Sequence, residues 1–124
     1  MTRIRRRLCV SRDSKRRNVN SDLAVMHCRA GAPRLADAEV SAALAALPGW
    51  TRSGDRIEKT FRFADYYRTM AFVNAVASIA HREDHHPDLE VYYDRCIVAW
   101  STHSAGGITQ NDLICAARVN EIVA

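Results

Sequence analysis

Four of the five histidines in this chain fall between residues 81 and 103, and their clustering is its most informative chemical feature. Histidine can donate and accept a proton near neutral pH, because its ordinary pKa lies there. His81 and His85 lie four positions apart and would share one face of a helix that extended that far. Pro87 disfavours helical geometry at His86, so the His85–His86 pair is predicted to lie in a loop that leaves a helix. His103 would approach this loop from the end of a strand.

The spacing of these histidines leaves three interpretations open. In the first, the imidazoles perform general acid–base chemistry. In the second, His81, His85 and His103 bind a zinc-like ion, although the chain has no HExxH motif to support a metal site. In the third, the histidines are solvated surface residues with no shared role.

The elements that must position these side chains are predicted from apolar periodicity and turn residues. The pattern predicts, in order, a helix over 35–47, a strand near residue 50, a strand over 56–63, a helix over 65–82, strands over 89–93 and 96–101, and a helix from residue 109. Pro48 and Gly49 end the first helix, Asp65 is the expected N-cap of the second, and Thr109 with Asp112 resembles a capping box. The order α-β-β-α-β-β-α predicts an α+β domain: a four-stranded antiparallel sheet with helices packed on one face.

The positive charge is confined to the beginning of the chain. The 124 residues carry a net charge of +4, but residues 1–30 hold nine basic and two acidic residues, and the remainder sums to −3. We therefore predict a basic, disordered extension over 1–30 and a domain over 31–124. The extension could be a nucleic-acid-binding tail, an organellar transit peptide or an upstream extension of the reading frame that precedes Met26. Nucleic-acid binding is not expected outside this arm.

The cysteines and the hydropathy pattern favour a reducing, cytoplasmic location. The four cysteines are Cys9, Cys28, Cys96 and Cys115, and none forms a CxxC motif. Cys96 and Cys115 fall in apolar segments, where a buried free thiol is the common role. The chain begins without the apolar region of a secretory signal and contains no stretch apolar enough to span a membrane.

The run from His81 to Pro87, followed by Tyr93, His103 and Asp112 at fixed spacings, resembles the signature of the pterin-4a-carbinolamine dehydratases. Residues 48–50, 61–66 and 101–103 are similar to further segments of that family, and the resemblance covers about residues 33–124. In two places the chain departs from the family: His81 stands where many members carry a glutamate, and Leu89 replaces a common tryptophan.

The resemblance implies an enzyme that dehydrates 4a-hydroxytetrahydropterin to quinonoid dihydropterin in pterin recycling, with no metal and no cofactor, since the pterin is the substrate. His85 and His103 would be the acid–base pair, and His86 would orient or bind the pterin. Further residues expected to bind the substrate are His81, Asp84, Ser101, Thr102 and Ser104. For Asp112 we favour a structural role at the start of the last helix over a catalytic one.

The resemblance also implies partners. Members of the family commonly form dimers or tetramers, and an edge strand of an open sheet offers a way to pair. A functional link to an aromatic amino acid hydroxylase is expected. The alternative function is a non-catalytic interaction protein of the same fold, such as a dimerisation cofactor or an assembly factor. Retention of His85, His86 and His103 favours the enzyme, because a scaffold does not need them.

Overall fold

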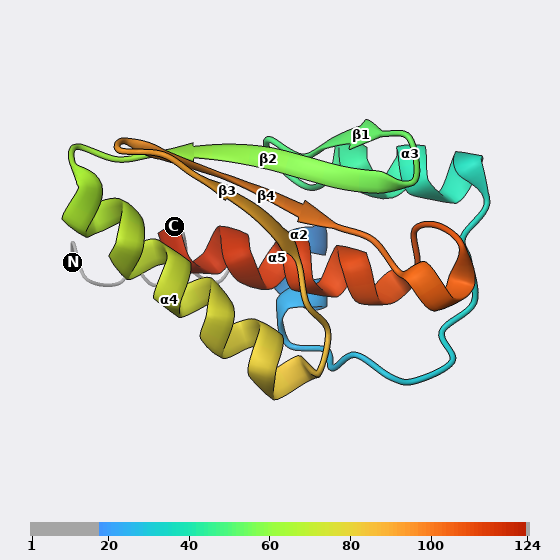
Figure 1. Ribbon diagram of the computed structural model, residues 1–124. Helices are drawn as coiled ribbons and strands as arrows, with labels where there is room; N and C mark the ends of the chain where they lie inside the picture. Colours follow the sequence, from blue (N-terminus) through green and yellow to red (C-terminus); the bar gives the residue numbers. More distant parts are fainter. Residues whose placement is uncertain (1–17, 124) are drawn as a thin grey trace, which may run out of the picture.

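The computed structural model describes residues 18–123 and is an α+β fold, as the sequence predicts (Figure 1). The elements in chain order are α2 (Val19–Ala24), α3 (Asp37–Ala45), β1 (Thr51–Ser53), β2 (Arg56–Arg62), α4 (Tyr66–Glu83), β3 (Asp88–Val91), β4 (Arg95–Trp100), the 3-10 turn η1 (His103–Ala105) and α5 (Gln110–Val123). From α3 onward, this order confirms the prediction.

The four strands form one antiparallel sheet in the order β1-β2-β4-β3. Helices α4 and α5 lie side by side across one face of this sheet (Figure 1). Alternate residues of β4, Cys96, Val98 and Trp100, are fully buried, because successive side chains of a strand point to opposite faces. They pack against apolar side chains of the helices, which include Phe72, Val76, Ile79, Ile114 and Val119. Burial of such side chains contributes about 1.5–3 kcal/mol each and fixes the helices on the sheet.

Helix α4 ends at the point where the predicted site begins. Asp65 caps its first turn by accepting a hydrogen bond from the backbone N–H of Arg68 at 2.9 Å. At the other end Asp84 adopts a left-handed conformation with φ 50° and ψ 44°. The N–H of His85 then returns to the carbonyl of Ala80 at 3.1 Å, in the manner of a Schellman motif. This turn directs His85 out of the helix, as Pro87 led us to expect.

The prediction that residues 1–30 form a disordered extension is wrong for residues 18–30. Helix α2 packs on α5, with Leu23 in the core. Asn20 donates to the carbonyl of Ala117 at 3.3 Å and accepts from Asn120 at 2.8 Å. A helix of six residues is too short to show an apolar periodicity in the sequence. Polar tertiary contacts hold it against α5. Residues 1–17, which hold eight of the nine basic side chains of the predicted extension, lie outside the described residues.

The described part of the chain contains no helix that is long and apolar enough to cross a membrane.

The three cysteines in the described part of the chain, Cys28, Cys96 and Cys115, are free thiols. Cys96 and Cys115 are buried, as predicted, and Cys28 is half-buried with its sulfur 3.5 Å from that of Cys115. Cys9 lies outside the described residues.

Candidate active site

A fully buried carboxylate, Asp112 in the first turn of α5, is the centre of the candidate site. Its Oδ2 accepts hydrogen bonds from the backbone N–H of Thr109 at 2.9 Å and from the hydroxyl of Thr102 at 2.8 Å. Its Oδ1 lies 2.6 Å from Nε2 of His85. Asp112 therefore caps the start of α5, as the sequence suggests, and its other oxygen holds the ring of His85 in place.

The hydrogen bond to Asp112 determines which ring nitrogen of His85 carries a hydrogen. An ionised carboxylate only accepts hydrogen bonds, so Nε2 must carry a hydrogen, and in the neutral ring Nδ1 then carries the lone pair. The ring also stacks on Trp100, with centroids 5.5 Å apart and planes 14° from parallel. The side chain is 14% exposed. A neutral His85 held in this way is a base with one defined accepting nitrogen.

His85 lines a cavity of about 240 Å³ together with Asp84, Thr102 and Ser104. These are three of the five residues predicted to bind substrate. One wall of the cavity comes from residues 28–32, which begin before the predicted domain. The cavity lining is mostly polar and includes hydroxyl, carboxylate and imidazole groups. Such a cavity can take a small polar heterocycle beside the imidazole.

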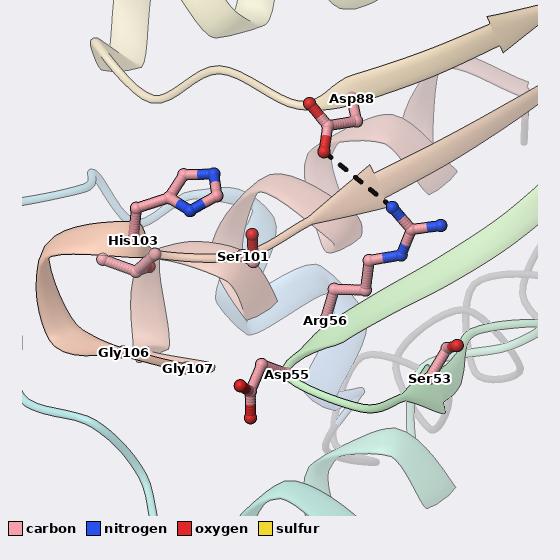
Figure 2. Close-up of a pocket in the computed structure, with 9 residues that line it drawn as sticks. Ser53, Asp55, Arg56, Asp88, Ser101, His103, Gly106 and Gly107 are labelled. Carbon is pink, nitrogen blue, oxygen red and sulfur yellow. Dashed lines mark ion pairs between the residues drawn. The ribbon is translucent and has the colours of Figure 1, made fainter.

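His103 and Ser101 line a second cavity, of about 340 Å³, at the end of the sheet (Figure 2). Figure 2 shows the guanidinium of Arg56 extending from β2 toward the Asp88 carboxylate at the start of β3, with a closest N–O distance of 3.8 Å. Thr102 lines this cavity as well as the first one. The structure thus places His85 and His103 on two cavities that share Thr102 as a lining residue.

The remaining predicted site residues, His81 and His86, are exposed and line neither of these two cavities. Among residues 18–123, no three histidine, cysteine or acidic side chains converge in a way that could hold a metal ion. Sequence reasoning missed the stacking of Trp100 on His85 and the wall formed by residues 28–32. The first has no local signal in the sequence, and the second lies largely in a segment that we expected to be disordered.

The fold and the site together define a class: a small α+β protein with a carboxylate-held histidine beside an open polar cavity. A family model described as pterin 4 alpha carbinolamine dehydratase matches residues 33–122, and the chain belongs to this family. A protein of Xanthomonas campestris pv. campestris (strain 8004) is 57% identical over 91 residues, which cover 72% of this chain and 77% of that protein. A protein of Stenotrophomonas maltophilia (strain K279a) is 55% identical over 91 residues, 72% and 78% of the two chains. Both carry provisional names as pterin-4-alpha-carbinolamine dehydratases.

Two solved structures share the fold. A protein from Brucella melitensis described as a transcriptional coactivator/pterin dehydratase matches with a TM-score of 0.71 and 34% identity, over 73% of this chain and 99% of its own. A pterin dehydratase-like protein described as a RuBisCO assembly factor in the alpha-carboxysome matches with a TM-score of 0.50 and 21% identity, over 60% and 87% of the two chains. The second match bears on the fold alone.

Proposed function

We propose that this protein is a hydro-lyase that converts 4a-hydroxytetrahydropterin to quinonoid dihydropterin and water, as a cytoplasmic step of pterin recycling. The observation that carries the proposal is the buried Asp112–His85 pair at the edge of a polar cavity, in a chain of the dehydratase family. In this proposal the pterin is the substrate and no further cofactor takes part.

The reaction requires two proton transfers. The bond between C4a and the hydroxyl oxygen breaks, and the oxygen takes a proton and leaves as water. The electron pair of the neighbouring ring N–H bond forms the new double bond to C4a, and its proton passes to a base. One group must therefore accept a proton and another must donate one, and near pH 7 two imidazoles can do both.

His85 is the base in this scheme, because its Nε2 faces Asp112 and its Nδ1 is left with the lone pair. A proton on Nδ1 makes the ring cationic, and the buried Asp112 carboxylate stabilises that charge. His103 is the acid that protonates the departing hydroxyl, and His86 orients the pterin. His81, Asp84, Ser101, Thr102 and Ser104 remain the candidates for substrate contacts.

The proposal is tested by stopped-flow measurement of 4a-hydroxytetrahydropterin dehydration. We expect His85→Gln and His103→Ala each to lower kcat by about 10²-fold or more. Asp37→Asn is the control, since that side chain is 82% exposed, lies in the first turn of α3 and lines neither cavity. Unchanged rates in both histidine variants would refute the mechanism. Loss of wild-type activity with a strong chelator would instead favour the metal interpretation.

The alternative, a non-catalytic interaction protein, is favoured by one feature of the surface. Tyr66 and Tyr67 at the start of α4 and Tyr92 and Tyr93 after β3 are exposed, and the hydroxyl of Thr69 in α4 donates to the carbonyl of Tyr93. These tyrosines offer a contact surface to a hydroxylase or to further copies of the chain in a homodimer or homotetramer. A wild-type protein that does not accelerate dehydration would support this alternative.

A further inference from the structure

Residues 28–32 supply five of the eleven residues that line the cavity beside His85. They lie just before residue 33, where the match to the family model begins. These residues form one wall of the cavity, and this wall therefore lies outside the range matched by the family model.

Two buried side chains, Glu83 at the end of α4 and Asn111 at the start of α5, clamp this segment next to His85 and Asp112. Glu83 accepts the backbone N–H of Cys28 at 2.7 Å and contacts Nδ1 of His27 at 3.0 Å. Asn111 accepts the backbone N–H of Arg29 at 3.1 Å and donates to its carbonyl at 2.8 Å. The clamp fixes the backbone of Arg29 from both sides.

The clamp residues are direct neighbours of the site in sequence. Glu83 is the last residue of α4 before Asp84 and His85, and Asn111 immediately precedes Asp112. Burial raises the pKa of Glu83, but the hydrogen bonds from Cys28 and His27 and the charge of Arg118 outweigh this effect and hold it below its usual range. Glu83 is therefore ionised near neutral pH and holds the segment as a carboxylate.

The guanidinium of Arg29 is the one cationic side chain of this wall. Arg29 is exposed, and among residues 18–123 its side chain has no hydrogen-bond or ion-pair partner. A guanidinium presents several N–H donors and no acceptor. With its backbone fixed and its donors unused, Arg29 is suited to bind an oxygen acceptor in the cavity.

We propose that Arg29 binds an oxygen acceptor of the pterin and that Glu83 and Asn111 are the positioning residues that hold it beside His85. This inference rests on the proposed function. Two parts of a pterin carry such an acceptor: the carbonyl of the pyrimidine ring and the hydroxyl groups of a dihydroxypropyl substituent at C6. Both accept hydrogen bonds from a guanidinium in the same way.

The test is steady-state kinetics of the full chain on two 4a-hydroxytetrahydropterins, one with a dihydroxypropyl and one with a methyl group at C6. We expect Arg29→Ala to raise KM about tenfold, which is about 1.4 kcal/mol, with kcat within about twofold. An effect on both substrates assigns the ring carbonyl, and an effect on the first alone assigns the side chain. Arg29→Lys should restore part of the affinity, because lysine keeps the charge and loses the planar donor fork.

The matched control is Arg82→Ala, which removes the same charge from an exposed arginine that lines a different groove, between α4 and α5. For the clamp, Asn111→Ala should raise KM to a similar extent. In the double variant with Arg29→Ala the two effects should not add, because they act on one contact. Thermal unfolding identifies any variant whose loss of affinity merely reflects loss of the fold.

Direct titration with 7,8-dihydrobiopterin separates the possible failures. If the wild type dehydrates the substrate and Arg29→Ala leaves KM and this binding unchanged, the inference is wrong and the proposed function stands. If the wild type neither accelerates the reaction nor binds the dihydropterin, the proposed function is wrong and the inference fails with it.

Discussion

Replacement of Asp112 by asparagine tests the site most directly, because it keeps the shape of the side chain and removes its charge. Oδ2 of Asp112 accepts a hydrogen bond from the backbone N–H of Thr109. A backbone N–H can only donate, so the atom at this position must remain an acceptor in the variant. The amide oxygen of the substituted side chain must therefore occupy the Oδ2 position, and its NH₂ group must face Nε2 of His85. His85 can accept from this NH₂ only through an unprotonated Nε2, so its hydrogen moves to Nδ1.

This change of tautomer removes the base that we assign to His85. We expect kcat to fall by about 10²-fold, which is about 2.7 kcal/mol of barrier. We also expect a loss of about 1–3 kcal/mol of folding free energy, because a hydrogen bond to a charged group is replaced by one between neutral groups. Asp112→Ala should cost more, since the donors at Thr109, Thr102 and His85 all lose their acceptor.

Three measurements check this prediction: stopped-flow dehydration, urea unfolding, and the nitrogen NMR shifts of the His85 ring, which distinguish its tautomers. Asp37→Asn is the matched control, because Asp37 also lies in the first turn of a helix but is 82% exposed at its side chain. The reasoning is refuted if Asp112→Asn keeps the wild-type kcat, or if Nε2 of His85 remains protonated in the neutral ring of that variant.

Three further predictions concern the supporting structure. The pKa of Glu83 is lower in the folded chain than its usual value; its contribution to stability is therefore complete above about pH 4.3 and is lost as the pH falls through the lowered value. Urea unfolding between pH 7 and pH 3 should show a smaller loss of stability in Glu83→Gln than in the wild type, and equal losses would contradict this account. Burial raises the pKa of Cys96 to about 11, so we expect no alkylation of this thiol by iodoacetamide at pH 8 until the chain unfolds; peptide mapping that finds native Cys96 modified would count against its burial. Gly49 has φ 85°, and a Cβ there would lie 2.6 Å from Cε of Lys59, so Gly49→Ala should destabilise the fold by about 1–2 kcal/mol; an unchanged urea midpoint would argue against the strain.

Local signals predicted most of the element boundaries to within one or two residues. Asp65 caps α4, Pro87 follows its end, and the apolar stripes that define α4 and α5 face the sheet. These features are readable because capping and periodicity act between residues a few positions apart. The prediction failed for residues 18–30, since α2 is held by hydrogen bonds to the carbonyl of Ala117 and the side chain of Asn120 in α5, which lie 97 and 100 positions from Asn20.

The sequence by itself determined which residues could do chemistry here: the histidines, their spacing, and the family to which that spacing belongs. Only the tertiary structure decided how they are arranged. It places Asp112 against Nε2 of His85, puts His85 and His103 on two cavities that share Thr102 as a lining residue, and brings residues 28–32 to the wall of the cavity that His85 lines. The physical reason is that these relations depend on how α4, α5 and the sheet pack together, and no local pattern encodes the distance between side chains that are far apart in the chain.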